Sequence, residues 1–226
     1  IDVLWVHAWD SWTPTEEIMK GLEDLVSRGM VHYIGVSDTP AWVVSQANTM
    51  AQLRGWSQFV GLQIEYSLIQ RSVEPELMQM ARAFGMTVTP WAPLAGGALT
   101  GKYLRGEQGR ITPQSARLGE RAVSITKKVV EVAERLGVSP AQVAINWTRQ
   151  HKGQSIVPIV GATKPAQLED VLGCLKFEIP TDAMNELNDV SKIELPFPHK
   201  FFSESGVLDV LYGGVKETMK DRRFGE

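Results

Sequence analysis

Cysteine is nearly absent from this sequence, because Cys174 is the single one among 226 residues. A disulfide within the chain is therefore impossible, and we expect a cytoplasmic protein of a reducing compartment. A lone thiol on the apolar face of a predicted helix indicates packing, so we expect Cys174 to be structural.

Long apolar runs and an excess of one charge are also missing. No stretch is long enough to span a bilayer. With 23 basic and 26 acidic residues the formal net charge is −3, which gives no basic surface for nucleic acid or anionic lipid. At 43% hydrophobic and 22% charged residues, the chain can bury one barrel-sized core or two small ones. We expect a soluble protein with neither nucleic-acid nor membrane partners.

Three common site motifs are absent as well. The sequence has no G-x-G-x-x-G after a predicted strand, no G-x-x-x-x-G-K-[ST] and no H-E-x-x-H. These absences argue against half of a Rossmann fold, against a P-loop and against a zinc protease. We expect no metal site.

Apolar runs alternate with amphipathic segments at a regular interval. The runs predict strands at residues 3–6, 32–36, 59–64, 86–89 and 155–160. The amphipathic segments predict helices at 14–28, 40–53, 75–84, 120–136, 140–150, 165–175 and 181–193, with Thr13, Ser139 and Thr181 or Asp182 as caps. The first four strands begin just under thirty residues apart, the length of one β-loop-α unit in a parallel sheet. The chain lacks an initiating Met and starts inside an apolar run, so we expect it to be part of something longer.

Residues able to bind a ligand stand at the end of every predicted strand. They are His7, Ser37 with Asp38, Gln63 with Glu65, Trp91, and residues 161–164. Parallel strands place their ligands beyond their carboxyl ends, both in open doubly wound sheets and in (β/α) barrels. The pattern therefore predicts one site at one rim, and it leaves both folds open.

A glycine-rich loop follows the fourth predicted strand. Gly96, Gly97 and Gly101 let backbone N–H groups approach a ligand, and Lys102 adds a positive charge. Trp91 offers a flat face to an aromatic ring. The combination favours a phosphate-bearing ligand, although an ordinary surface loop beside a packing Trp fits these residues equally well.

Six segments together resemble the aldo-keto reductase superfamily. They are LWVH from residue 4, GVSD from 35, LQIEYS from 62, PWAPLAGG from 90, LTGKY from 99 and GATKPAQLED from 161. That family is an α/β (β/α)8 TIM barrel that reduces carbonyls with NAD(P)H. The resemblance implies that residues 1–226 are the C-terminal part of one barrel domain, holding strands four to eight. It also implies that residues 92–119 are a cofactor loop and that the tail, 196–226, lies near the site.

The resemblance also implies roles for individual residues. His7 matches the active-site histidine that orients the substrate carbonyl, whereas a lone His is more often a satisfied core residue. Trp9 and Trp12 would line the substrate pocket, which favours aromatic or apolar aldehydes and ketones. NADP(H) would be held by Ser37, Asp38 and Gln63 at the carboxamide, Trp91 on the nicotinamide ring, Pro93, Leu94, Gly96, Leu99 and Lys102 at the diphosphate, and Gly161, Thr163, Lys164, Gln167 and Asp170 at the adenosine end.

Several positions depart from the family or have a simpler explanation. Asp38 and Val171 stand where the family has Asn, so each loses an amide hydrogen bond. Asp38 can also cap the next helix, and Lys164, the expected partner of the 2′-phosphate, can simply be solvated.

The family's proton-donating tyrosine, with its lysine and aspartate, lies before the histidine and has no match here. Tyr33, Tyr66, Tyr103 and Tyr212 all lie outside that motif. The expected function is NADP(H)-dependent reduction of aldehydes or ketones by a protein that includes a preceding barrel segment. The alternative is a non-catalytic nucleotide-binding regulatory subunit on the same fold, as in potassium-channel β-subunits.

Overall fold

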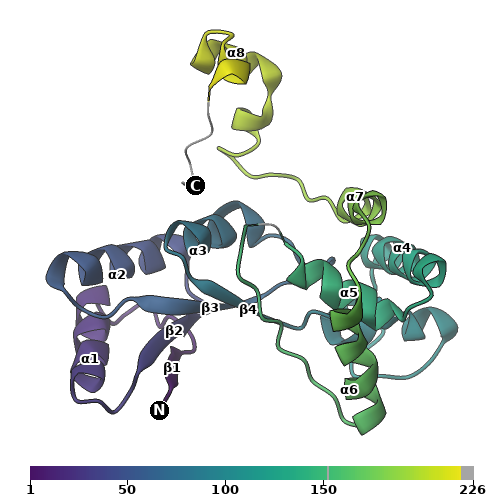
Figure 1. The fold of residues 1–226 in the computed structure, drawn as a ribbon, viewed down its shortest axis with the longest axis horizontal. Coiled ribbons are helices and arrows are strands. Elements are labelled where there is room, and N and C mark those ends of the chain that lie inside the picture. The colour runs from purple at the N-terminus through teal and green to yellow at the C-terminus, as the bar shows by residue number, and fades with distance from the viewer. Residues whose placement is uncertain (152, 220–226) are drawn as a thin grey trace.

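The computed structural model describes residues 1–151 and 153–219, which form an α/β fold. Its parallel sheet has the order β1-β2-β3-β4, so each strand pairs with the next along the chain (Figure 1). The strands are β1 (Val3–Val6), β2 (Tyr33–Ser37), β3 (Phe59–Glu65) and β4 (Thr87–Trp91). The helices are α1 (Thr15–Ser27), α2 (Ala41–Arg54), α3 (Gln79–Ala83), α4 (Glu120–Leu136), α5 (Pro140–Arg149), α6 (Pro165–Leu172), α7 (Thr181–Val190) and α8 (Ser205–Tyr212).

One face of the sheet is buried under α1, α2 and α3. Side chains of a strand alternate between faces, and Ile34, Val36 and Leu62, on this face, are at most 2% exposed. They belong to one hydrophobic cluster with Met19 of α1 and Val44 of α2. Each such side chain stabilises the fold by about 1.5–3 kcal/mol. The cluster holds the strands in parallel, so their carboxyl ends meet at one edge.

Trp5 occupies the opposite face of the sheet. Its indole lies against the neighbouring strands where both carry glycine: a Cβ atom would come within 2.5 Å of the ring at Gly35 and within 2.8 Å at Gly61. A side chain at either position would collide with the ring. The two glycines therefore make the space that Trp5 fills.

The fifth predicted strand, 155–160, is not a regular strand in the structure. It runs parallel to β4 and makes a single bridge, between Val88 and Ile156. Ile159 N–H donates to Pro90 O at 2.8 Å, but a second bridge also needs an N–H from Pro90 to the next carbonyl. Proline has none, so the ladder stops there.

Three helices are shorter or less regular than predicted. The third begins as a π-helical turn, Glu74–Met78, before α3. The sixth ends at Leu172 and continues as a 3₁₀ turn, Gly173–Lys176. The seventh ends at Val190.

One of the predicted helix caps is confirmed. Ser139 Oγ accepts a hydrogen bond from Gln142 N–H at 3.2 Å at the start of α5. The expected caps Thr13 and Thr181 or Asp182 are wrong, because Pro14 and Pro180 hold those positions without side-chain bonds. Thr13 instead donates its N–H and its hydroxyl to the Asp10 carboxylate.

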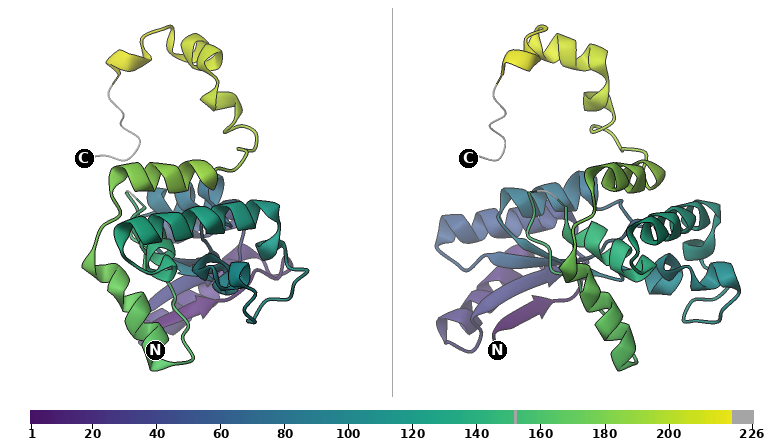
Figure 2. Two further views of the ribbon diagram at one scale, coloured as in Figure 1. Left: turned by 90° about the vertical axis from the view of Figure 1, so that its right-hand side faces the viewer. Right: turned by 45° about the vertical axis from the view of Figure 1, so that its right-hand side comes forward.

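The tail does not pack beside the strand ends. Residues 196–219, including α8, project away from the body (Figures 1 and 2). Phe197 and Val210 are both 83% exposed, and Phe201 packs on Phe202 with ring centroids 5.6 Å apart. His199 pairs with Glu76 at 2.8 Å. The expectation that the tail lies near the site is therefore not met in residues 196–219, and residues 220–226 lie outside the described part.

Among the described residues, no helix combines the length and the apolar character needed to cross a membrane.

Candidate cofactor site

A cavity of about 820 Å³ opens at the carboxyl end of β4. Its size falls in the range of small-molecule and cofactor sites, roughly 300–1,000 Å³. Residues from β4, the glycine-rich turn, the loop 102–119, α5 and α6 line it: Trp91, Ala92, Pro93, Leu94, Gly96, Gly97, Thr100, Lys102, Arg105, Glu107, Arg110, Arg117, Ala141, Ile159, Val160, Gly161, Thr163, Gln167, Asp170 and Val171. Nine predicted cofactor residues are among them: Trp91, Pro93, Leu94, Gly96, Lys102, Gly161, Thr163, Gln167 and Asp170.

The turn after β4 is strained at two residues. Ala92 and Ala95 have φ of 52° and 50°, in the left-handed region that alanine rarely adopts. Gly96 and Gly97 follow with φ of 70° and 93°, which glycine adopts freely. A backbone that retains such conformations in a cavity wall commonly belongs to a binding site. Within the turn, the N–H groups of Ala95 and Gly97 donate to Ala92 O at 2.8 Å and to Leu94 O at 2.9 Å.

Leu99 was predicted to contact the diphosphate, but it does not line the cavity. Its side chain is 0% exposed and belongs to the main hydrophobic core, while its N–H donates to Leu94 O at 3.3 Å. The segment Ala95–Thr100 is kinked at Gly96 and Gly97, and Leu99, which follows the kink, points into the core while Gly96 lines the cavity. Leu99 therefore anchors the turn without lining the cavity.

Lys102 crosses the base of the following loop. Its Nζ lies 5.0 Å from the centroid of the Tyr103 ring, and it would be 3.2 Å from a Cβ at Gly97. Tyr103 Oη accepts a hydrogen bond from Ile111 N–H at 3.1 Å, which holds the loop in its curved path. The ammonium is thus kept beside the glycine turn, where an anion would neutralise it.

Three arginines that the motifs did not single out line the same cavity. Arg105 pairs with Glu107 at 2.6 Å, and Arg117 pairs with Glu65 at 2.6 Å. Arg110 is the third. They lie in a loop with no periodicity, and the tertiary fold alone brings them to the wall. The sequence signal that could have pointed to them is the presence of arginines among small polar residues in this loop.

On the α6 side of the cavity, side-chain hydrogen bonds hold the N-terminus of the helix in place. Gln167 Oε1 accepts hydrogen bonds from Thr163 N–H at 2.9 Å, from its hydroxyl at 3.1 Å and from Lys164 N–H at 3.3 Å. The Asp170 carboxylate accepts from Ser139 Oγ and from Gln142 Nε2, both at 3.0 Å. Both side chains are already bonded within the protein.

Lys164 is the N-cap residue of α6 and is exposed. It is not among the residues that line the cavity. Its assignment to a 2′-phosphate stays a prediction.

The remaining predicted residues follow β1, β2 and β3 at the same rim. Val6 pairs with Val36, and Ser37 pairs with Gln63, so His7, Ser37 and Gln63 succeed one another across the sheet. His7 is exposed and Gln63 is half-buried. None of the three lines the cavity itself.

Ser37 is the last residue of β2, and Asp38 begins the turn after it. Asp38 is exposed with φ of 44°, a conformation that Asp tolerates better than most residues. Ser37 is 2% exposed, and its Oγ has no hydrogen-bond partner among the described residues. A buried polar atom is almost always bonded, so this hydroxyl is placed to receive a polar group from outside. Together with the strained turn and the cations, it fits a nicotinamide dinucleotide.

An aromatic cluster stands beside this rim. Trp9 meets Trp42 of α2 edge to face, with ring centroids 5.6 Å apart. Trp42 is 62% exposed and Trp12 is 89% exposed. Trp42 was not singled out in the sequence, because only the pairing of β1 with β2 brings it beside Trp9.

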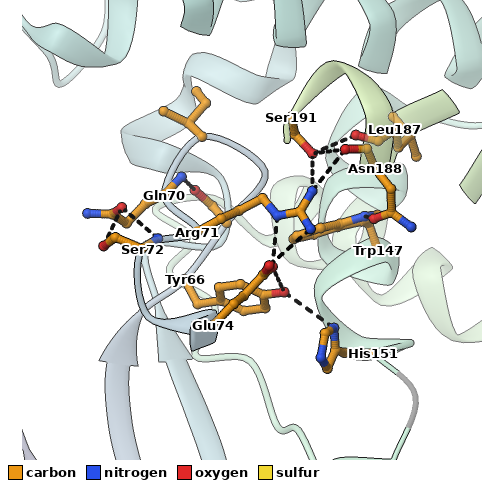
Figure 3. Close-up of polar contacts among 12 residues, drawn as sticks. Tyr66, Gln70, Arg71, Ser72, Glu74, Trp147, His151, Leu187, Asn188 and Ser191 are labelled. Atoms are coloured by element: carbon orange, nitrogen blue, oxygen red, sulfur yellow. Dashed lines mark hydrogen bonds and ion pairs between the residues drawn. The ribbon is translucent and has the colours of Figure 1, made fainter. Parts of the chain in front are cut away.

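A second polar cluster lies behind β3, where α5 and α7 meet (Figure 3). Arg71 donates to Glu74 from Nε at 2.8 Å and from Nη2 at 3.0 Å. Its Nη1 donates to Asn188 O at 3.1 Å and to Ser191 Oγ at 2.7 Å. The guanidinium therefore ties the segment after β3 to the end of α7.

Tyr66 joins this cluster through its hydroxyl, which donates to Glu74 Oε1 at 2.8 Å. Burial, followed by the negative charge of Glu74, raises the pKa of the Tyr66 phenol. Burial also disfavours the charged form of His151, and so it lowers the pKa of that imidazole. Its Nδ1 lies 3.4 Å from the Tyr66 hydroxyl. A bonded phenol with a raised pKa is a poor proton donor, which marks the cluster as structural.

No group of three or more His, Cys, Asp and Glu side chains in the described part of the chain is placed to hold a metal ion.

Similarity to known proteins extends over most of the chain. The model of the aldo/keto reductase family matches residues 1–192. A probable aryl-alcohol dehydrogenase of Saccharomyces cerevisiae is 33% identical over 211 residues, covering 90% of this chain and 64% of the relative. An aryl-alcohol dehydrogenase [NADP(+)] of Phanerodontia chrysosporium is 34% identical over 221 residues, covering 94% of this chain and 57% of the relative.

A norsolorinic acid reductase of Emericella nidulans is also similar, 33% identical over 207 residues, which is 91% of this chain and 52% of the relative. The chain thus spans between about half and two thirds of the length of these three relatives. Because the family model covers most of the sequence, this chain belongs to the aldo/keto reductase family.

Proposed function

We propose that this chain forms the cofactor-binding part of an NADP(H)-dependent oxidoreductase that interconverts aldehydes or ketones with alcohols. The observation that carries the proposal is the cavity wall, where the strained turn from Ala92 to Gly97 lies beside the Trp91 ring and the Lys102 ammonium. Backbone amides and cations suit a diphosphate, and the indole suits a nicotinamide ring. The name of the Phanerodontia relative adds support for NADP.

Each part of the wall has its own task in this proposal. Trp91 stacks on the nicotinamide, while Ser37 Oγ and Gln63 bind its carboxamide. Lys102 and Arg117 neutralise the diphosphate. The α6 end, from Gly161 to Asp170, takes the adenosine. The cofactor, when bound, supplies the hydride for the carbonyl carbon.

His7 contacts the substrate in this proposal, and the residues named above contact the cofactor. It follows β1 at the rim and is exposed, so its imidazole N–H can donate to a carbonyl oxygen. Such a bond orients the carbonyl toward the nicotinamide and stabilises charge that develops on its oxygen.

The proton donor in this proposal lies outside the described chain. Tyr66 is bonded to Glu74, and Tyr103 Oη accepts from Ile111 N–H. Tyr33 stands at the start of β2, at the end of the sheet opposite the rim, and Tyr212 lies on the projecting α8. None of these positions suits a general acid beside His7.

Three exposed surfaces support a segment that completes the barrel. In the described sheet β1 pairs only with β2. On the other side of the sheet, next to β4, Val157 is 58% exposed. An apolar stripe of Leu168, Leu172 and Leu175 on α6 and its following turn is 45%, 50% and 62% exposed. We propose that further βα units, supplied before β1, cover these surfaces, close a (β/α)8 barrel and bring the acid.

The substrate class follows from the rim and from the relatives. Trp9, two residues after His7, and Trp42, which contacts it, offer flat apolar faces near this rim, and Trp12 of the same loop is exposed. Two of the similar proteins are named for aryl alcohols. Aromatic aldehydes and ketones are therefore the substrates proposed, since stacked rings add roughly 0.5–1.5 kcal/mol beyond area burial.

The deciding experiment measures binding and turnover separately. Calorimetric titration of the protein with NADPH tests the cavity. NADPH oxidation with benzaldehyde, measured with the chain alone and co-expressed with a matching N-terminal segment of a relative, tests catalysis. We expect binding and turnover only in the assembled protein, together with improved solubility. Binding without turnover on any of a panel of aldehydes would instead support the regulatory subunit, and no binding would overturn the proposal.

A further inference from the structure

The ion pair between Glu65 and Arg117 lies where the cofactor cavity meets the end of β3. Glu65 is the last residue of β3 and pairs in register with Trp91. Arg117 comes from the 3₁₀ turn Ala116–Leu118 and donates from Nη2 to Glu65 Oε1 at 2.6 Å. The two side chains keep 31% (Arg117) and 23% (Glu65) of their surface exposed, so a bound ligand can reach them.

The other end of the same guanidinium faces the glycine turn. Arg117 Nη1 lies 3.4 Å from the place of a Cβ atom at Gly96, and Arg117 lines the cavity. One nitrogen therefore serves the carboxylate beside Trp91, and the other is poised over the turn assigned to the diphosphate.

A dianionic diphosphate and the Glu65 carboxylate are both acceptors for this guanidinium. Arginine binds planar or tetrahedral anions best with two parallel N–H groups, so full use of Arg117 by a phosphate requires Nη2 as well as Nη1. The carboxylate also adds a like charge near the diphosphate, which weakens binding.

We propose that Glu65 is a positioning residue that holds Arg117 over the glycine turn before the cofactor binds and then competes with the diphosphate for it. The inference rests on the proposed NADP(H) function. Its consequence is that Glu65 speeds cofactor release and lowers affinity for any dinucleotide. A purely structural ion pair predicts the opposite change in NADPH affinity. Its loss would let Arg117 leave the cavity wall and would weaken binding.

The test compares wild type with Glu65→Gln, both prepared as the assembled protein with the co-expressed N-terminal segment. The substitution keeps the shape of the side chain and removes its charge. NADPH affinity is measured by calorimetry, and the dissociation rate by stopped-flow displacement with excess NADP⁺. We expect Glu65→Gln to bind NADPH about two- to fivefold more tightly, the range given by partly exposed ion pairs, with a proportionate fall in the dissociation rate. The affinity for adenosine 2′-monophosphate, which carries no diphosphate, should not change.

Two further variants keep the result interpretable. Arg117→Ala should weaken NADPH binding, and Glu65→Gln should have a different effect on affinity in that background than in wild type, because the partner shared with the diphosphate is gone. Lys128→Ala is the matched control and should leave both cofactor measurements unchanged, because Lys128 pairs with Glu131 and Glu186 and does not line the cavity. Circular dichroism confirms that each variant folds.

The outcomes separate this inference from the function it rests on. Wild type that fails to bind NADPH overturns both. Wild type that binds NADPH, together with a Glu65→Gln variant of equal or lower affinity, overturns the competition alone and leaves the proposed function standing.

Discussion

The indole of Trp5 lies against the backbone of Gly35, where a Cβ atom would come within 2.5 Å of the ring. Because the contact is with the rigid ring of a neighbouring strand, Gly35→Ala must displace Trp5 or the strand. We predict a loss of about 1–3 kcal/mol in the free energy of unfolding, typical of overpacking.

The control for this prediction is Gly21→Ala in α1, where nothing lies within 4 Å of the new methyl group. There alanine should raise stability by about 1 kcal/mol, because it is the better helix former. Urea denaturation measures both variants, and equal stability changes would contradict the packing argument.

Removing the Trp91 ring should weaken cofactor binding. Trp91 ends β4 and lines the cavity, so Trp91→Ala removes the proposed stacking surface. We expect NADPH affinity to fall by about 1 kcal/mol, while Trp91→Phe, which keeps a ring, retains most of it. Calorimetry is the measurement, since the substitution removes a fluorophore. Unchanged affinity in Trp91→Ala would rule out the stacking role.

The two lysines assigned to phosphates should differ in what they recognise. Lys102 lines the cavity beside the glycine turn, so Lys102→Ala should weaken NADPH and NADH equally, because both carry the diphosphate. Lys164→Ala should weaken NADPH alone and so narrow the difference between the two cofactors. Titration of each variant with both cofactors decides the matter. An equal loss of affinity for NADPH and NADH in Lys164→Ala would contradict the assignment of Lys164 to the 2′-phosphate.

The Arg71 cluster should contribute to stability. Its side chain is only 13% exposed and donates to Glu74, Asn188 and Ser191, so Arg71→Ala leaves the Glu74 carboxylate, whose side chain is 19% exposed, without its cation. We predict a loss of about 3 kcal/mol. The matched control is Lys20→Ala, in an exposed pair with Asp24, which should cost less than about 1 kcal/mol. Similar losses of unfolding free energy in Arg71→Ala and Lys20→Ala would show that the Arg71 cluster stabilises the fold no more than an exposed ion pair does.

His151 should make the protein less stable in mild acid. Burial lowers the pKa of its imidazole in the folded state, whereas the unfolded chain takes up the proton near pH 6.5. The unfolded state therefore binds more protons as the pH falls below about 6.5, and stability is lost from there downward until the folded pKa is reached.

Substituting His151 should remove this part of the pH dependence. His151→Gln should have a flatter stability profile between about pH 6.5 and 5 than wild type, measured by thermal unfolding at each pH. His32→Gln, which changes an exposed imidazole, is the control. A wild-type profile that already lacks a slope in this window would contradict the prediction.

Local sequence predicted most of the elements, because the signals for strands and helices act over a few residues. The apolar runs gave β1 to β4 within two residues at each end, and Ser139 capped α5 as expected. The fifth strand failed because its ladder depends on Pro90, which lies on a different segment far away in the sequence. The lack of an N–H matters only once the two segments are paired.

The candidate site divides in the same way. By itself the sequence determined the rim of polar strand ends, the glycine turn and Lys102, since each is a local pattern with a local physical reason. Only the tertiary structure decided that Leu99 turns into the core, that Lys164 stands outside the cavity and that Arg117 of the cavity wall pairs with Glu65. These outcomes depend on how segments more than fifty residues apart pack and share charge, and no local pattern carries that information.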